Sequence, residues 1–356
     1  MKNVFCKAPW VSLQYGSLLM HGGVTPCCEW TGAAFKGSLN EYMSGEWLAN
    51  VKNIMSDTSV TSHREYVNRS CENCINLDNL GITSKRQQLQ EFEIHDGIQL
   101  VDYRPDNICN LKCRMCFPGN SSMIAKEQNH SFEILDTSDI YQFDFSTVTS
   151  LSIVGGEPSI SKEVDTFLQW LIDNGRSEYI VLKVTTNATN ANANWIDKLK
   201  KFPKCHTVIS LDGTNEIYEY IRTNANWDSI VKNIKSYEFE NNVITYQITG
   251  SMYNMPVIER WIDWFADKDN VTLYPVEGRK SLMLSALPDN IRFEKMKFLE
   301  SIDNNLARDA YTILNDTRFN RNHLDWFIEY THALDNLRNT DITKLDPVFK
   351  KIMEII

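Results

Sequence analysis

The chain has 356 residues, of which 42% are hydrophobic, and carries a net charge of −10. A chain of this length buries about 75% of its unfolded surface without help from disulfides, so one large domain, or a large and a small one, is expected. The negative charge argues against a general binder of nucleic acids or of anionic membranes.

No stretch of the sequence reaches the ~18 consecutive apolar residues of a transmembrane helix. The N-terminal sequence MKNVFCKAPWVSL also lacks the apolar segment of a secretion signal. We therefore expect a cytoplasmic protein with no membrane partner. Cysteines stay reduced in the cytoplasm, where clusters of them indicate a metal site or catalysis more often than disulfides. The nine cysteines are Cys6, Cys27, Cys28, Cys71, Cys74, Cys109, Cys113, Cys116 and Cys205.

Residues 1–80 are predicted to form a small cysteine-rich α+β domain. They contain five of the nine cysteines, and five glycines precede Leu39. The stretch WVSLQYGSLLMHGGVTPCCEW (10–30) indicates a hairpin of two short strands around its glycines, and residues 38–55 indicate a helical segment. Residues 81–96 are polar and are predicted to be a helical linker.

Short apolar strands alternate with amphipathic helices over residues 97–285. Enrichment in Val, Ile, Thr and Tyr predicts six strands, at 98–103, 150–155, 179–186, 207–212, 243–249 and 271–276. Helical periodicity predicts helices at 162–175, 194–202, 226–239 and 257–267. Six βα units favour an α/β fold with a parallel sheet, arranged as a partial (β/α)6 TIM-like barrel. Residues 286–356 are predicted to form a helical C-terminal extension.

The motif CNLKCRMC places Cys109, Cys113 and Cys116 directly after the first of these strands. Such a triple spacing has an expected chance frequency of roughly 0.006 in this composition, so it indicates a metal site. Zinc sites and iron–sulfur clusters both take four ligands, and the spacing alone does not choose between them.

The loops after the following strands also carry distinctive residues. The sequence GGEP (155–158) follows the second strand, Asn187 follows the third, SLDG (210–213) ends the fourth, and GSMYN (250–254) follows the fifth. In a parallel βα barrel these loops open on one face. The sequence therefore predicts a single site that the loops build together.

The cysteine motif, the GGEP loop and the six βα units together resemble the radical S-adenosylmethionine (radical SAM) enzymes, over about residues 96–280. One mild departure is Met115, at a position that is often aromatic in this family. The resemblance implies that Cys109, Cys113 and Cys116 hold a [4Fe–4S] cluster, with SAM on the fourth iron. One electron from the reduced cluster then cleaves SAM and yields a 5′-deoxyadenosyl radical.

The same resemblance assigns seven loop residues to SAM. Three would hold its amino group, three would face its ribose and one would pair with its carboxylate: Gly155, Gly156 and Glu157; Asn187, Ser210 and Asp212; and Arg222. A guanidinium suits a carboxylate. The alternatives are an ordinary glycine turn, polar residues that cap strand ends, and a surface salt bridge of the arginine.

The N-terminal cysteines resemble the SPASM/twitch domain, which holds an auxiliary cluster in many radical SAM enzymes. Here this region precedes the barrel, whereas in the family it usually follows. The resemblance implies a second [4Fe–4S] cluster, and a zinc site is the alternative that the spacing allows. The four proposed ligands are Cys6, Cys27, Cys71 and Cys74.

The two remaining cysteines are assigned to neither group of ligands. Cys28 is a candidate to replace Cys27 as a ligand, or to donate a hydrogen atom to a substrate radical. Cys205 is expected to be a buried structural thiol.

The sequence therefore favours a radical SAM enzyme that abstracts a hydrogen atom from an unidentified substrate, either a peptide or protein or a small molecule. No additional N-terminal peptide-binding domain is evident, which disfavours large leader-dependent substrates. The auxiliary cluster would transfer electrons, and a flavodoxin or ferredoxin would serve as electron donor. Two alternatives are a two-cluster electron-transfer protein without SAM chemistry and a zinc-stabilised binding module on a degenerate barrel.

Overall fold

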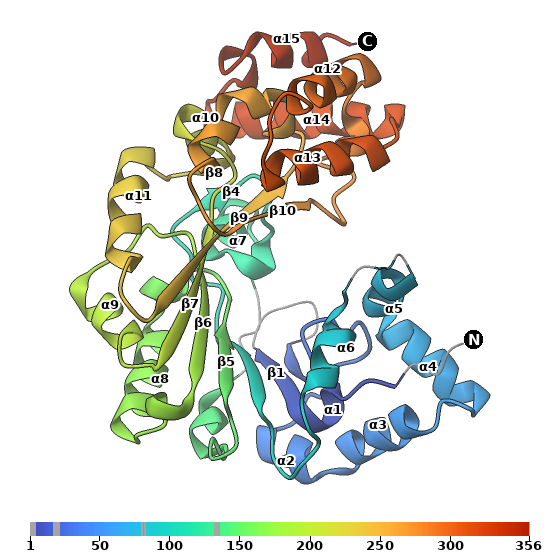
Figure 1. The fold of residues 1–356 in the computed structure, drawn as a ribbon, viewed down its shortest axis with the longest axis vertical. Helices are drawn as coiled ribbons and strands as arrows, with labels where there is room; N and C mark the ends of the chain where they lie inside the picture. The colour runs from blue at the N-terminus through green and yellow to red at the C-terminus, as the bar shows by residue number, and fades with distance from the viewer. Residues whose placement is uncertain (1–4, 17–21, 80, 82, 132–135, 356) are drawn as a thin grey trace.

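The computed structural model describes residues 5–16, 22–79, 81, 83–131 and 136–355. Eight strands form one sheet in the order β10-β9-β7-β6-β5-β3-β1-β2 (Figure 1). They are β1 (Ser12–Gly16), β2 (Gly23–Thr25), β3 (Leu100–Arg104), β5 (Ser150–Ile153), β6 (Val181–Thr186), β7 (Lys204–Ser210), β9 (Asn242–Gly250) and β10 (Val271–Pro275).

The six strands expected in the βα region are confirmed as β3, β5, β6, β7, β9 and β10. Each pairs with its neighbour in parallel and in chain order, as crossover helices require. No pairing joins β10 to β2 within the described residues, so the sheet is open. The α/β class is confirmed, whereas the barrel-like curvature stays a prediction.

Three of the four expected helices are confirmed, as α8 (Lys162–Asp173), α9 (Ala193–Leu199) and α11 (Trp227–Ile234). They lie on one side of the sheet (Figure 1). Helix α8 begins at Ser161, whose hydroxyl accepts a hydrogen bond from the Val164 amide, and its buried residues recur at helical spacing. Two shorter helices complete the crossovers, α7 (Ser122–Glu127) and α10 (Asn215–Ile221).

The prediction of an α-helix at 257–267 is wrong. The segment forms two 3₁₀ helices, η7 (Met255–Arg260) and η8 (Ile262–Phe265), with a kink at Val257. The non-helical backbone at Val257 interrupts the segment, and 3₁₀ turns suit such short pieces. The other 3₁₀ helices are η1 (Leu89–Glu91), η2 (Pro118–Asn120), η3 (Ser138–Gln142), η4 (Pro158–Ile160), η5 (Ser177–Tyr179), η6 (Lys235–Tyr237), η9 (Leu284–Ala286) and η10 (Ile342–Lys344).

The N-terminal hairpin does not belong to a separate domain, which corrects the sequence-based expectation. Strand β1 pairs in parallel with β3 and antiparallel with β2, so the hairpin extends the main sheet. Both faces of β1 are buried, and Leu13 and Tyr15 belong to the main core. Burial of the apolar face of β1 favours the attachment of the hairpin to the main sheet. Residues 17–21, which connect β1 to β2, lie outside the described residues.

A second, smaller core lies among the N-terminal helices and contains Cys6, Trp30, Met55 and Cys71. The segment expected to be helical at 38–55 is confirmed as two helices, which meet at Gly45. Two polar helices at 61–79 were not anticipated, because few of their residues are buried. The helices are α1 (Ala8–Val11), α2 (Leu39–Ser44), α3 (Glu46–Ser56), α4 (Thr61–Ser70), α5 (Glu72–Asn79) and α6 (Lys85–Gln88).

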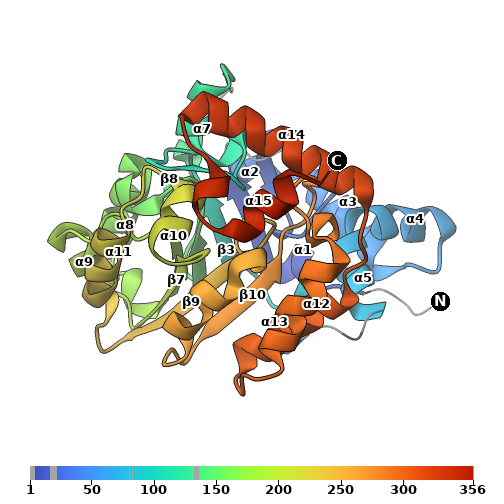
Figure 2. The ribbon, with the colours of Figure 1, turned by 90° about the horizontal axis from the view of Figure 1, so that it is seen from above.

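The C-terminal extension is helical, as predicted. It consists of α12 (Asp289–Leu299), α13 (Asn305–Asp316), α14 (Arg321–Arg338) and α15 (Pro347–Met353). These helices gather at one end of the sheet, and in Figure 2, which is seen from above, α14 runs across that end. The boundaries between 1–80, 81–96, 97–285 and 286–356 stay predictions. In the described part of the chain, no helix has the length and apolarity needed to cross a bilayer.

Candidate active site

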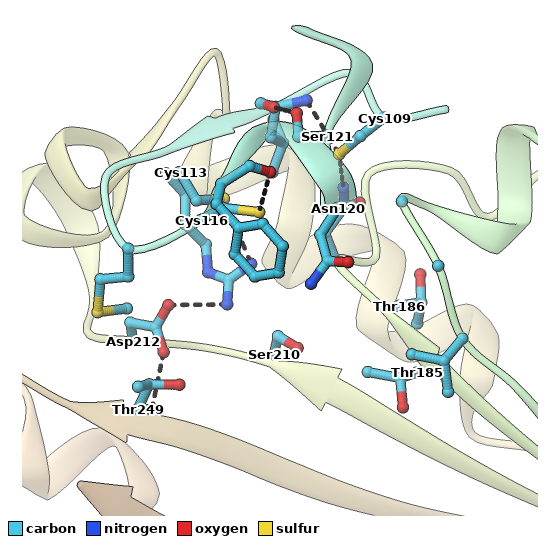
Figure 3. Close-up of a pocket in the computed structure, with 18 residues that line it drawn as sticks. Cys109, Cys113, Cys116, Asn120, Ser121, Thr185, Thr186, Ser210, Asp212 and Thr249 are labelled. Atoms are coloured by element: carbon cyan, nitrogen blue, oxygen red, sulfur yellow. Dashed lines mark hydrogen bonds and ion pairs between the residues drawn. The ribbon is translucent and has the colours of Figure 1, made fainter. Parts of the chain in front are cut away.

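One cavity of about 290 Å³ lies where the strands β5, β6, β7 and β9 end. Figure 3 shows the three motif cysteines on one side of it and Ser210, Asp212 and Thr249 on strand ends opposite. Nine of the ten residues predicted for the cluster and SAM line this cavity: Cys109, Cys113, Cys116, Gly155, Gly156, Asn187, Ser210, Asp212 and Arg222. The structure therefore brings the predicted loop residues together, as expected for the carboxyl edge of a parallel sheet.

A short two-stranded sheet holds the cysteine loop in place. Strand β4 (Lys112–Cys113) pairs antiparallel with β8 (Arg222–Thr223), and the partner of Cys113 in this register is Arg222. The guanidinium Nη1 of Arg222 lies 3.7 Å from the Cys113 sulfur. The two residues are 109 positions apart in the chain, and sequence reasoning did not anticipate this pairing.

The surroundings of the motif cysteines disfavour the thiolate form of their side chains. Burial raises the pKa of Cys113 to about 12 and that of Cys116 to about 11, and it also raises the pKa of Cys109. Arg222 opposes this effect at all three residues, but the net pKa shift stays upward. Buried thiolates at this cavity therefore need further positive charge, which bound metal supplies.

The arrangement is compatible with a [4Fe–4S] cluster. Within the described residues, no group of three or more Cys, His, Asp or Glu side chains is placed to hold one metal ion. Thiolates on one zinc must converge to Zn–S distances of about 2.3 Å, whereas in a [4Fe–4S] cluster each thiolate binds its own iron. Three cysteines that share a cavity without converging on one point meet the second requirement.

Asp212 and Arg222 form a buried ion pair at the wall of the cavity. Nη2 of Arg222 lies 2.7 Å from Oδ2 of Asp212, and the Thr249 amide donates to Oδ1 at 2.9 Å. Burial would lower the pKa of Arg222, but Asp212 and Cys113 raise it above its ordinary value. Nε of Arg222 is buried and has no hydrogen-bond partner among the described residues, so a donor remains for a bound carboxylate. Asp212, predicted to face the ribose, instead has its carboxylate engaged by Arg222 and Thr249.

The two glycines of GGEP allow a close approach between two loops. Gly155 has φ of 151°, and a Cβ there would come within 2.6 Å of the Asp106 carbonyl oxygen. A Cβ on Gly156 would collide with the Asn107 and Ile108 backbone. Glycine is therefore required at both positions, and it keeps the backbone accessible at the cavity.

Glu157 is the predicted SAM residue that does not line the cavity. Its side chain is buried, and Oε1 accepts hydrogen bonds from the Ser159 amide at 3.1 Å, the Ser159 hydroxyl at 2.6 Å and the Thr186 hydroxyl at 2.6 Å. Oε2 accepts from the Asn187 amide at 2.6 Å. The carboxylate thus joins the loops after β5 and β6. Glu157 positions Asn187, whose Nδ2 lies 4.0 Å from the Cys109 sulfur.

We expect Glu157→Ala to lower the free energy of unfolding by about 3 kcal/mol, because each buried donor left without an acceptor costs about 1–3 kcal/mol. Glu157→Gln mimics the neutral carboxyl group and separates the effect of charge. Burial raises the pKa of Glu157. Its contribution to stability is therefore complete below the unfolded-state pKa and is lost as pH rises through the folded-state value.

Wild-type protein should consequently lose more stability than the Glu157→Gln variant as pH rises from about 4.5 to 7. Denaturant unfolding of iron-free protein at several pH values measures this difference. Parallel pH dependences of the two proteins would contradict a buried, raised-pKa carboxyl at this position.

The four predicted auxiliary ligands meet at a separate small cavity. Cys6, Cys27, Cys71 and Cys74 line it together with Arg86. Burial raises the pKa of Cys6 to about 11 and that of Cys71 to about 12. None of the nine cysteines, all within the described residues, forms a disulfide.

Cys28 lies apart from this group. It lines a cavity of about 230 Å³ with Glu29, Arg104 and Phe117. The geometry therefore favours Cys27, not Cys28, as the fourth auxiliary ligand. Cys205 is fully buried in the main core, as predicted, with its sulfur 3.8 Å from the Thr207 hydroxyl.

Comparison with known proteins finds similar sequences and folds. Residues 103–258 match the model of the Radical SAM superfamily. A cysteine-type anaerobic sulfatase-maturating enzyme of Clostridium novyi is 29% identical over 153 residues, which cover 38% of this chain and 40% of that enzyme. The 7-carboxy-7-deazaguanine synthase of Aquifex aeolicus is 23% identical over 206 residues, which cover 58% of this chain and 76% of the synthase.

The solved structure of native anSMEcpe with bound AdoMet aligns with 65% of this chain and 66% of its own, at 17% identity and a TM-score of 0.44. The chain thus spans about two fifths of the sulfatase-maturating enzyme and about two thirds of the solved structure. The segment matched by the family model begins in β3, ends in η7, and contains the cysteine motif, GGEP, Asp212 and Arg222. Residues 103–258, somewhat less than half of the chain, are therefore similar to the radical SAM superfamily.

Proposed function

We propose that the protein is a radical SAM enzyme. The observation that carries this proposal is the convergence of three cysteines, a Gly-Gly turn and a buried arginine with a free donor at one cavity. When bound there, a [4Fe–4S] cluster and SAM supply a 5′-deoxyadenosyl radical, which abstracts a hydrogen atom from the substrate. The protein's own task is to bind, orient and shield these groups.

The residues of the cavity divide this task. Cys109, Cys113 and Cys116 would hold three irons of the cluster, and the backbone at Gly155 and Gly156 would bind the amino group of SAM. The free Nε of Arg222 is the donor for its carboxylate, since charge-assisted hydrogen bonds are the stronger ones. The apolar lining is suited to excluding water from a radical, and it consists of Leu111, Met115, Phe117 and Val154.

The substrate would lie in the second cavity, the one that Cys28 lines. Phe117 lines both this cavity and the SAM cavity, while Glu29 and Trp30 line both it and the auxiliary cavity. A substrate there would have the SAM site on one side and the auxiliary cysteines on the other. Cys28 would face it as a thiol, because burial raises its pKa to about 11; donation of a hydrogen atom by Cys28 is thus part of the proposal.

The substrate class stays open between a peptide or protein and a small molecule. One relative is named for maturing sulfatases, which are proteins, and the other for the synthesis of a deazaguanine. The auxiliary cysteines would hold a second [4Fe–4S] cluster that transfers electrons, and a flavodoxin or ferredoxin would reduce the enzyme. Nine unpaired cysteines suit the reducing cytoplasm.

The experiment that tests the proposed function is an anaerobic assay of reduced, iron-reconstituted protein with SAM. We expect 5′-deoxyadenosine and methionine, detected by mass spectrometry, with slow turnover even without a substrate. Protein that holds iron but forms no 5′-deoxyadenosine would favour the alternative of an electron-transfer protein.

The auxiliary site gives a second prediction. We expect Cys71→Ala to lose about four of about eight irons per chain, because a cubane needs its four thiolates, while it retains SAM cleavage. Cys28→Ala is the matched control and should keep all its iron. Iron analysis and the SAM assay on both variants measure this, and stoichiometric zinc in the wild type would instead identify a zinc site.

A further inference from the structure

Helix α14, in the C-terminal extension, contacts both chain neighbours of Cys113. Arg338 donates from Nη1 to the Lys112 carbonyl at 2.8 Å, and the Tyr330 hydroxyl donates to the Arg114 carbonyl at 2.9 Å. Asp335 lies between them along the helix and accepts from Nη2 of Arg114 at 2.7 Å. The loop that carries Cys113 is thus held from three points of one helix.

The contact between Arg114 and Asp335 is deeply buried. Arg114 is 0% exposed, and its guanidinium carbon lies 3.6 Å from the centre of the Tyr220 ring. Asp335 also accepts from the Tyr220 hydroxyl at 2.8 Å and from the Ile342 amide at 2.9 Å. Removing one member of such a pair leaves an uncompensated buried charge, so this contact strongly favours a single position of the loop.

A second buried ion pair lies on the other side of Cys113. Nη2 of Arg338 lies 2.6 Å from Oε2 of Glu127, and Nζ of Lys112 lies 2.8 Å from Oε1 of the same carboxylate. Both the Arg338 and Glu127 side chains are more than nine-tenths buried. This pair fixes Lys112, helix α7 and α14 to one another.

We infer that α14 is a functional part of the cysteine site, with Asp335 and Arg338 as positioning residues for Cys113. They hold the loop together with β8, whose Thr223 hydroxyl also accepts from Nη1 of Arg338 at 3.3 Å, so that the thiols are placed before any cluster binds. A hydrophobic contact of similar volume is often as stabilising as a buried ion pair, but it fixes position less specifically. The charged contacts on both sides of Cys113 therefore point to placement of this loop as their role.

The placement of the thiols by α14 can be tested in iron-free, full-length protein. The role of α14 in cluster binding rests on the proposed function. We expect Asp335→Asn and Arg338→Met to increase the alkylation rate of Cys113 and Cys116 at least tenfold relative to Cys205 in the same chain. Peptide mass spectrometry measures each rate. Lys295→Met is the matched control, because Lys295 is a buried cation of the same extension that pairs with Glu259 at 2.6 Å and with Glu294, and not with the loop. It should leave the rates within about twofold.

A second experiment measures the rate at which reconstituted protein loses iron. Reconstituted Asp335→Asn and Arg338→Met should lose iron to a chelator at least tenfold faster than the control, and Arg338→Lys should recover part of the difference. Alkylation rates of both variants that equal those of the control would overturn the inference. If Asp335→Asn fails to fold, Arg338→Met, which keeps the Arg114 pair, decides the question by the same rates. A wild-type protein that binds no cluster would overturn the proposed function. The alkylation rates would still test whether α14 places the Cys113 and Cys116 thiols.

Discussion

Replacing Cys109, Cys113 and Cys116 together by alanine is expected to abolish the formation of 5′-deoxyadenosine and to leave about four of about eight irons per chain. The three thiols line one cavity, and burial leaves each with a raised pKa, so they depend on bound metal for their charge. Without them no open iron is available to SAM. Iron analysis and an anaerobic SAM assay measure both effects.

Cys205→Ala is the control for this experiment. Its thiol is fully buried in the core at the beginning of β7, whereas the three motif cysteines are partly buried and line the cavity. We expect this variant to keep its iron and to cleave SAM. Cleavage that persists in the triple variant would show that another part of the chain holds the SAM cluster. Loss of all iron would show that the two groups of cysteines do not bind metal independently.

Arg222→Met should both destabilise the protein and remove most of its affinity for SAM. The substitution leaves Asp212 buried without its cationic partner, which costs about 3–5 kcal/mol. It also removes the donor proposed for the SAM carboxylate, and a charge-assisted hydrogen bond of about 1.5–3 kcal/mol corresponds to a roughly 10- to 150-fold loss of affinity. Denaturant unfolding and equilibrium binding of SAM to reconstituted protein measure the two effects.

The double variant Arg222→Met/Asp212→Asn separates stability from binding. Asparagine keeps an oxygen for the Thr249 amide but carries no charge, so we expect most of the stability to return. SAM affinity should stay low, because the guanidinium is still absent. Recovery of SAM affinity in the double variant would mean that Arg222 acts only as a partner of Asp212 and does not bind the ligand.

The sequence by itself determined the order of strands in the βα region and the cysteine motif at the candidate site. The six strands of the βα region were predicted correctly because β-branched and aromatic residues mark buried strands locally. The spacing of Cys109, Cys113 and Cys116 is likewise local, and so is the Gly-Gly turn. Their meeting at one edge follows from the parallel arrangement alone.

Only the tertiary structure decided how each side chain is used. The Glu157 side chain is directed to the loop after β6, and the hairpin β1–β2 joins the main sheet. The adjacent residues Cys27 and Cys28 line different cavities. Each outcome depends on which surface packs against the residue, and this is invisible in its own segment of sequence.

The contacts around Cys113 are the clearest case of this kind. Arg222 reaches it through the β4–β8 pairing, and Asp335 holds the adjacent Arg114 from 221 positions further along the chain. Charged residues of this kind usually lie at the surface, so nothing in the local sequence marks them as buried partners. These side chains become buried and paired only when the C-terminal helices pack against the cysteine loop. This packing connects the C-terminal extension to the site.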